Sequence, residues 1–415
     1  MGRGKQRVVM ALVSSVLGLI IVAWILERRP DAGTVELVDT RDEVAQYFLK
    51  RSNEKPEGVA RNTVMAAPPS APLMVGRHNY ADLPRALAKR MFPTIRKPNP
   101  RSQYDPYSFY WGKAGFRYSM PGRTHPDGDY LMVNNSLGFR RETELSQVKP
   151  DLRVIVTGDS HTEGVVPMHE HLTEVAEAIL RRDRPERSVE VINAGVGGYM
   201  LYNYSGVARK FEGLTPDVFV VVVYGGNDFS SSVGTYRFFH RLPVSAHVPK
   251  EFRAEWKRLS KESTQLFAQS LNQVIRLHCQ PQELALAKEA ISEFVQDTRG
   301  ICEQAGSKFV LMYLPSLFEV QPHLDEEGIR TALENLGWNY EELTETSDLA
   351  NSMLQEAESL GVPCIDLRDA FRAASEPLYW DFDHHINTAG HALAAKQLSQ
   401  LLDGLGDGRP SKVHR

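Results

Sequence analysis

The chain has 415 residues, of which 42% are hydrophobic and 24% are charged, and its formal net charge is −4 at pH 7. This composition is that of a globular protein with room for one large domain plus extensions, or for two domains. The slightly acidic balance supplies no global basic field, so it argues against a nucleic-acid partner.

An apolar run without charged residues extends from Val8 to Leu26. Its length is about the 20 residues that a helix needs to cross a bilayer, and Trp24 suits the membrane interface. Basic residues precede the run and mixed charges follow it, which favours a cytoplasmic N-terminus and an exported remainder. We expect residues 1–29 to form a cytoplasmic tail and a single-pass signal anchor through residues 8–26; a cleaved signal peptide is the alternative.

The next predicted segment, residues 30–129, is a linker followed by an irregular lead-in. Residues 67–72 and 97–100 are rich in proline and read as breaks. Residues 104–111 are rich in aromatic side chains. We expect these rings to pack a lobe onto the main domain, with an aromatic platform for a substrate as the alternative.

From residue 151 onwards, short apolar strands alternate with helical patterns. This alternation predicts a parallel sheet that is covered on both faces, and right-handed crossovers bring the C-terminal ends of all strands to one edge. The expected strands are Leu152–Thr157, Val189–Asn193, Val218–Tyr224, Phe309–Leu314 and Pro363–Asp366, and the expected helices lie near residues 170–183, 200–212, 282–305, 345–360 and 388–402.

Two insertions, residues 229–281 and 316–344, leave from the C-terminal ends of strands, so we expect a lid or specificity cap. The first contains a basic, aromatic stretch at residues 236–241, which fits either an acidic substrate or a solvated surface. Residues 403–415, rich in glycine and charge, are expected to be a disordered tail.

The cysteines are few and odd in number, which allows at most one disulfide and no disulfide framework. The sequence has no Cys-x-x-Cys, so a thiolate metal site is not expected. The three are Cys279, Cys302 and Cys364.

Directly after the first strand the chain reads Gly158-Asp159-Ser160. A serine at the C-terminal end of a parallel strand stands where open α/β folds bind their ligands. The spacing differs from the Gly-x-Ser-x-Gly elbow of α/β-hydrolases, and a serine that caps the next helix is the alternative. We expect Asp159 to be a structural hydrogen-bond acceptor and His161 to be exposed on the substrate side.

Three further loops share this edge of the predicted sheet, and each carries a different polar residue type. They are the glycine-rich residues 193–199, residues 224–228 with Asn227 and Asp228, and residues 380–391 with several histidines and aspartates. For Asn227 and Asp228 taken alone, a turn or a helix cap is the alternative.

With these four blocks, residues 130–402 resemble the SGNH (GDSL-type) hydrolase family. The first block matches at residues 158–160, the second at Gly198 and the third at residues 225–228, and residues 134–140 look like the Asn-x-x-Gly-Phe-Arg lead-in of many bacterial members. The resemblance implies a flavodoxin-like, three-layer α/β sandwich with a five-stranded parallel sheet and no cofactor. The anchor and the cap insertions would be additions to this fold.

The last block departs from the family pattern of Asp-x-x-His. Asp381 and His384 fit that spacing literally, whereas His385 has the asparagine two residues later and leaves the shorter pair Asp383 and His385. The shorter spacing resembles the related alginate O-acetylation proteins. We favour His385 as the base with Asp383 as its partner, and keep His384 with Asp381 as the alternative pair.

The histidines and aspartates of residues 380–391 are of the types that bind metal ions. Ligands crowded in one loop rarely point to a common centre, however, so we expect no metal. His391 is expected to pack within the last helix.

These residue types suit acyl transfer. A serine becomes a good nucleophile when a neutral imidazole takes its proton, and a carboxylate behind the imidazole fixes its tautomer. The resemblance assigns the oxyanion donors to the amides of Ser160 and Gly198 and to the side chain of Asn227.

The sequence thus predicts a membrane-anchored, extracytoplasmic serine esterase, in the periplasm or outside the cell. It would remove small O-acyl groups, such as acetyl, from a carbohydrate through an acyl-enzyme on Ser160. An O-acetyltransferase of the same fold, acting on a cell-surface polysaccharide, is the first alternative, since water exclusion by the insertions decides between the two. A catalytically silent glycan-binding or scaffold module is the second. Protein partners are not predicted.

Overall fold

The computed structural model describes residues 72–97, 99–122, 125–243, 248–381 and 383–406. The expected anchor, residues 8–26, lies outside these ranges. Within them, no helix combines the length and the apolar character that a membrane crossing requires.

A five-stranded parallel sheet forms the centre, with strand order β11-β10-β9-β7-β8. If these five strands are renumbered 1 to 5 in chain order and read from the β8 edge, their order is 2-1-3-4-5, as in flavodoxin-like doubly wound sheets. β7, β8 and β9 are rich in valine and isoleucine and are buried at every residue, as parallel strands between helices are, whereas the edge strand β11 is partly exposed. The prediction of all five strands is confirmed, with end residues shifted by at most one position: β7 Leu152–Thr157, β8 Val189–Asn193, β9 Val218–Tyr224, β10 Lys308–Leu314 and β11 Cys364–Asp366.

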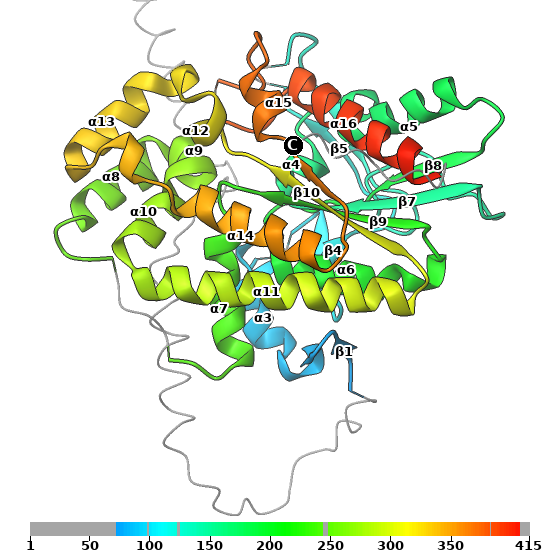
Figure 1. Cartoon of the computed structure of the whole chain (residues 1–415), viewed down its shortest axis with the longest axis horizontal. Coiled ribbons are helices and arrows are strands. Elements are labelled where there is room, and N and C mark those ends of the chain that lie inside the picture. Colours follow the sequence, from blue (N-terminus) through cyan, green and yellow to red (C-terminus); the bar gives the residue numbers. More distant parts are fainter. Residues whose placement is uncertain (1–71, 98, 123–124, 244–247, 382, 407–415) are drawn as a thin grey trace, which may run out of the picture. The chain divides into compact units, whose positions relative to one another are not determined.

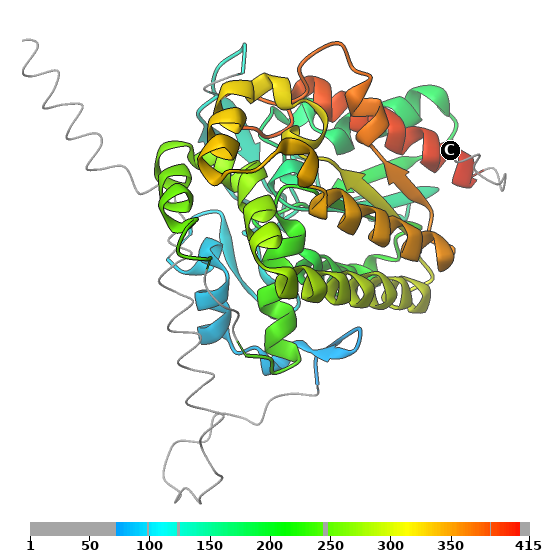
Figure 2. The same cartoon turned by 60° about the vertical axis from the view of Figure 1, so that its left-hand side comes forward.

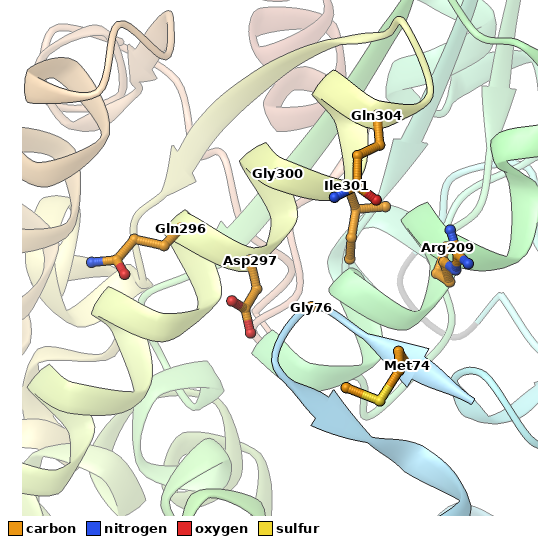
Figure 3. A pocket seen from close by; sticks show the side chains of 8 residues that line it. All are labelled: Met74, Gly76, Arg209, Gln296, Asp297, Gly300, Ile301 and Gln304. Carbon is orange, nitrogen blue, oxygen red and sulfur yellow. The ribbon is translucent and has the colours of Figure 1, made fainter. Parts of the chain in front are cut away.

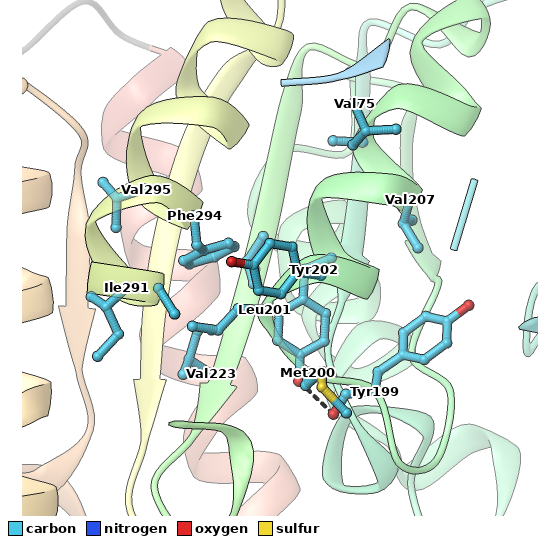
Figure 4. Packing of buried hydrophobic residues seen from close by; sticks show 14 of the residues in the cluster. Val75, Tyr199, Met200, Leu201, Tyr202, Val207, Val223, Ile291, Phe294 and Val295 are labelled. Atoms are coloured by element: carbon cyan, nitrogen blue, oxygen red, sulfur yellow. Dashed lines mark hydrogen bonds between the residues drawn. The ribbon is translucent and has the colours of Figure 1, made fainter. Parts of the chain in front are cut away.

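Helices cover both faces of this sheet (Figure 1). On one face, Ile155, Val221 and Val223 pack with α6, α11 and α14, and Figure 4 shows Val223 among side chains of α6 and α11. On the other face, Val156 and Val220 pack with α5 and α16. Fully burying such a side chain contributes about 1.5–3 kcal/mol, so the alternation along each strand fixes its register. The helices of these layers are α4 Ser160–Glu163, α5 Leu172–Asp183, α6 Leu201–Phe211, α11 Pro281–Gln304, α14 Glu345–Ser359, α15 Arg368–Arg372 and α16 Thr388–Gly406.

The two insertions are helical and contact each other, since α13 packs against α8 (Figures 1 and 2). Their elements are α7 Asp228–Phe239, α8 Arg253–Glu262, α9 Thr264–Leu266, the π-helical turn η5 Phe267–Leu271, α10 Asn272–Cys279, α12 Leu317–Val320, the 3-10 turn η6 Pro322–Asp325 and α13 Glu326–Leu336. The aromatic stretch at residues 236–241 packs against the lead-in and α11 instead: Tyr236 and Phe238 are buried, and Nε2 of His240 lies 2.8 Å from a carboxylate oxygen of Glu293 in α11.

The lead-in is more regular than expected, because short strands pair within it. They are accompanied by the short helix α3 Arg85–Met91, and the pairs are β1 Met74–Val75 with β2 His78–Asn79, β3 Ser102–Asp105 with β4 Phe109–Gly112, and β5 Arg117–Met120 with β6 Tyr130–Val133. The expected packing of aromatic rings is confirmed for Phe109, Tyr110 and Trp111, which are buried. Tyr110 contacts Tyr199 with ring centroids 4.9 Å apart.

The predicted tail boundary at residue 403 is wrong by four residues, because α16 continues to Gly406. Leu402 is buried against the sheet layer, and Asp403 forms an ion pair of 2.9 Å with Arg184, which extends the helix. Residues 407–415 lie outside the described ranges. All three cysteines are free thiols.

Candidate active site

Ser160 is the first residue of α4, directly beyond the C-terminal end of β7. Asp159 caps this helix, since its Oδ1 accepts the backbone N–H of His161 at 2.9 Å. The expected structural role of Asp159 is therefore confirmed. Burial raises the pKa of this carboxyl to about 6.

His385 faces the serine across the site. Its Nε2 lies 2.8 Å from Oγ of Ser160, and its Nδ1 lies 3.4 Å from Oδ1 of Asp383, which also accepts the His385 backbone N–H at 3.0 Å. Burial favours the neutral imidazole, but the Asp383 carboxylate outweighs burial and raises the pKa of His385 above its usual value. Burial works against the Asp383 carboxylate too, yet His385 keeps its pKa below the usual value. The structure thus brings together the serine and the favoured pair.

The alternative pair is not brought to the serine. Nε2 of His384 lies 3.3 Å from Oδ2 of Asp325 in η6, so this imidazole is paired with the second insertion. Asp381 is exposed and, among the described residues, forms no hydrogen bond or ion pair with either histidine. The backbone of His384 has φ 58°, a left-handed conformation that turns consecutive histidines in different directions.

The glycine loop after β8 lies next to the serine, because a Cβ placed on Gly197 would be 3.6 Å from Cβ of Ser160. The Gly197 amide is already used, since it donates to Oε2 of Glu163 at 3.1 Å. The amides of Gly198 and of Ser160 donate to no other atom of the described part of the chain. Gly198 has φ 79° and is exposed, so its amide is available to a substrate.

Asn227 stands at the N-cap position of α7, where β9 ends, but its side chain makes no capping hydrogen bond. The neighbouring Asp228 is buried instead, and its Oδ2 accepts the Tyr204 hydroxyl at 2.7 Å and the Tyr224 amide at 2.8 Å. The side chain of Asp228, whose pKa burial raises well above its usual value, therefore anchors the loop, while the carboxamide of Asn227 is left for a ligand.

The expectation for His161 is wrong: its side chain is fully buried, not exposed on the substrate side. The ring stacks on Tyr224 with centroids 3.7 Å apart and lies 4.5 Å from the ring of His385. Burial lowers the pKa of His161 well below its usual value. It is therefore neutral and part of the floor of the site.

Arg140 holds the backbone that follows Ser160 in place. Its guanidinium is buried and donates to the carbonyl oxygens of Glu163 at 2.6 Å and Val166 at 2.9 Å. Burial lowers its pKa to about 10, so it is charged at neutral pH. The Gly-Phe-Arg lead-in thus holds the chain that follows the nucleophile position.

Two groups of histidine and carboxylate side chains are close enough to share a metal ion in the described residues, and neither includes residues 381–391. They are His78 with His240 and Glu293, and His125 with Asp127 and Glu170. A cavity of about 240 Å³ lies apart from the serine, between the β1 hairpin and α11 (Figure 3), and Met74, Arg209 and Asp297 are among its lining residues.

The fold is a doubly wound α/β sheet, and a serine that faces a histidine lies beyond the end of its first strand. The family model of the GDSL-like lipase/acylhydrolase family matches residues 156–393, and the chain belongs to this family. It is an esterase of the SGNH type.

Solved structures with a similar fold include LAE5, an alpha/beta hydrolase enzyme from the metagenome of Lake Arreo, Spain, with 20% identity over 60% of this chain and 93% of that chain and a TM-score of 0.35. The acetyl xylan esterase AlAXEase has 16% identity over 60% and 100% of the two chains and a TM-score of 0.36. A catalytic mutant of Axe2, an acetylxylan esterase from Geobacillus stearothermophilus, has 15% identity over 65% and 100% and a TM-score of 0.36. The comparison with curated proteins returned no match.

Sequence reasoning missed several side chains around the site, and one of them lies against His385: Nε2 of Gln269 in η5 is 3.5 Å from Nε2 of His385. It lies in a helical stretch of the first insertion that carries no motif. The one sequence signal that could have indicated Gln269 is the prediction that the first insertion leaves from the edge of the sheet where Ser160 lies.

Proposed function

We propose that Ser160 is the nucleophile of this esterase, with His385 as its general base and Asp383 as the partner of His385. The observation that carries this proposal is the distance of 2.8 Å between Oγ of Ser160 and Nε2 of His385, together with Asp383 at 3.4 Å on the other side of the ring. The shorter of these distances, between Ser160 and His385, is one at which a hydroxyl proton passes to an imidazole.

In the first half of the reaction, Oγ of Ser160 attacks the ester carbonyl while its proton moves to Nε2 of His385. The tetrahedral intermediate collapses when His385 returns this proton to the leaving alkoxide, which leaves an acyl-enzyme on Ser160. In the second half water attacks the acyl carbonyl while His385 takes its proton. The second tetrahedral intermediate then collapses as His385 returns this proton to Oγ of Ser160, which releases the acid and regenerates the serine.

The negative oxygen of both intermediates would be held by the amides of Ser160 and Gly198 and by the carboxamide of Asn227. This assignment is supported because, in the described residues, none of these three donors makes a hydrogen bond to another group. The Gly197 amide, in contrast, donates to Glu163. Removing one such donor typically slows turnover by a factor of about 10²–10³.

The substrate we propose is a small O-acyl ester, most simply an acetyl ester on a carbohydrate. Side chains crowd the oxyanion loop: a Cβ on Gly198 would be 3.1 Å from Oγ1 of Thr94 and 3.2 Å from the hydroxyl of Tyr110, which favours a short acyl group. Beside the serine, Arg101 is partly exposed and paired with Glu163 at 3.1 Å, a polar setting that suits a sugar hydroxyl as leaving group.

The apolar run at residues 8–26 supports a membrane-anchored enzyme with its catalytic domain outside the cytoplasm. In this setting an acetylated cell-surface polysaccharide is the natural substrate class. The short spacing of Asp383 and His385, similar to that of alginate O-acetylation proteins, supports an O-acetyltransferase as the second candidate.

Hydrolysis of 4-nitrophenyl acetate tests the proposal. Ser160→Ala should abolish the burst and the turnover while leaving the fold intact, and full activity in this variant would refute the nucleophile assignment. Acetylated oligosaccharide then separates the candidates: free acetate supports the esterase, and acetyl groups moved to an acceptor glycan support the transferase. Glycan binding without any turnover would support the silent module.

A further inference from the structure

The first insertion contributes a side chain to the catalytic centre. Gln269 is buried in the π-helical turn η5, and π turns often occur at functional sites. Its carboxamide bridges two imidazoles: Oε1 lies 3.2 Å from Nε2 of His161, and Nε2 lies 3.5 Å from Nε2 of His385.

The backbone N–H of Ile386 determines which atom donates and which accepts in each hydrogen bond of this bridge. The N–H of Ile386 points at Nδ1 of His161 at 3.3 Å, so Nδ1 must be the acceptor. Because His161 is neutral, its proton is then on Nε2 and is donated to Oε1 of Gln269. The amide nitrogen of Gln269 is thereby turned towards His385.

We propose that Gln269 is a positioning residue that keeps Nε2 of the base His385 unprotonated and directed at the serine. A donor that faces Nε2 favours the tautomer with its proton on Nδ1, next to Asp383, and disfavours the imidazolium. The one lone pair of Nε2 then accepts the hydroxyl of Ser160 at 2.8 Å, with the amide of Gln269 as a second and more distant donor at 3.5 Å. The inference rests on the proposed roles of Ser160 and His385 and adds a residue that acts through the base.

The bridge is held rigidly from both sides. The backbone carbonyl of Gln269 accepts the hydroxyl of Tyr224 at 2.7 Å, and the Tyr224 ring stacks on His161. A Cβ on Gly226 would come within 2.0 Å of that same carbonyl oxygen, so the loop after β9 closes tightly on the π turn. The hydrogen bonds return to Ile386, the neighbour of His385, and form a closed ring.

Few titratable groups face His385 in the described residues. They are Asp383 from its own loop, Asp159 and His161 from the serine turn, and His391 from α16. Gln269 itself is neutral, so replacing it with glutamate changes one charge and leaves the shape of the side chain unchanged.

The test is Gln269→Glu, studied in the full-length protein. A carboxylate at this place should pair with the imidazolium and raise the pKa of His385 by about 1–3 units. The measurement is the titration of the His385 ring nitrogens by ¹⁵N NMR, which needs no substrate. The acid limb of the kcat/KM profile for 4-nitrophenyl acetate should move up by the same amount.

Gln273→Glu is the matched control. Gln273 is equally buried one turn further along, but it bonds to the Gly225 carbonyl, the Ser230 amide and the Thr346 hydroxyl instead of to a histidine. It should lose stability without moving the pKa of His385. An unchanged pKa in both variants would overturn the inference.

If the glutamate variant does not fold, Gln269→Met provides a second test, because methionine has a similar shape but makes no hydrogen bonds to the two histidines. It should give a mixture of His385 tautomers and a kcat lowered by about tenfold or more. A single tautomer with wild-type kcat would refute the role of Gln269. Activity that survives in Ser160→Ala would instead refute the proposed function, so the two failures are distinguishable.

Discussion

At the scale of single residues, the backbone of Gly198 determines where the amide that we propose as an oxyanion donor points. Its φ of 79° is strained for any residue with a Cβ, and that Cβ would be 3.1 Å from Oγ1 of Thr94. Gly198→Ala should therefore displace the amide and lower kcat by about 10²–10³-fold, the cost of losing an oxyanion donor. The measurement is kcat for 4-nitrophenyl acetate.

Gly306→Ala is the control for this prediction. Gly306 also has a positive φ, of 67°, but nothing lies within 4 Å of its Cβ position. It should cost about 1–3 kcal/mol of stability from backbone strain alone and leave kcat unchanged. Equal kcat values in the two variants would contradict the placement of the oxyanion donor at Gly198.

Residue-scale prediction from the sequence located neighbours correctly where a motif carried both a residue type and a position, and the catalytic roles of those residues stay a prediction. Ser160 and Asp383 with His385 come together at the strand ends as the spacing suggested. It failed for His161, because a residue beside the nucleophile reads as exposed unless the partners that bury it, Tyr224 and Gln269, are known. Those partners are far away in the sequence.

At the scale of secondary-structure elements, α16 and α5 are joined by a buried histidine. Nδ1 of His391 in α16 accepts the N–H of Leu172, the first residue of α5, at 3.2 Å. Burial lowers the pKa of His391 to about 3, whereas the unfolded chain protonates it near 6.5. The unfolded state therefore binds a proton that the folded state does not, and stability is lost as the pH falls below about 6.5.

His391→Asn keeps an acceptor for the Leu172 amide and removes the titration. The unfolding free energy of wild type should fall relative to this variant by about 1.4 kcal/mol per pH unit between pH 6 and 4, measured by urea denaturation. His169→Asn, at a side chain that is 80% exposed, should show no such difference. A pH-independent gap between wild type and His391→Asn would rule out a buried neutral His391.

Elements with a clear pattern of apolar residues could be located from the sequence, and elements without such a pattern could not. The strands of the sheet are continuous apolar runs such as Val218–Tyr224, which only a doubly covered parallel sheet buries completely. The π turn at Phe267–Leu271 has no pattern of its own, since its conformation depends on the contact of Gln269 with the loop after β9. The short strands of the lead-in likewise depend on pairing and not on local sequence.

At the scale of the described part of the molecule, the lead-in and the sheet share one apolar cluster, with Phe109 and Tyr110 of β4 packed in the same cluster as Val221 and Val223 of β9. Asn203 of α6 donates to the Ser108 carbonyl at 2.7 Å, which ties the lead-in to the helix layer. The lead-in and the sheet should therefore unfold together.

Native-state hydrogen exchange checks this expectation. The amides of β4 and β9 should exchange with the same opening free energy, because each requires the loss of the shared core. Exchange of β4 at a much lower free energy, with β9 still protected, would show that the lead-in is a separate unit.

The most direct test of the account is covalent labelling of the protein with a fluorophosphonate, which reacts only with an activated serine, followed by mapping of the modified peptide. The account predicts an adduct on Ser160 that is lost in His385→Ala and retained in His384→Ala, since His384 is paired with Asp325. An adduct on another residue, or labelling of Ser160 that survives in His385→Ala, would contradict it.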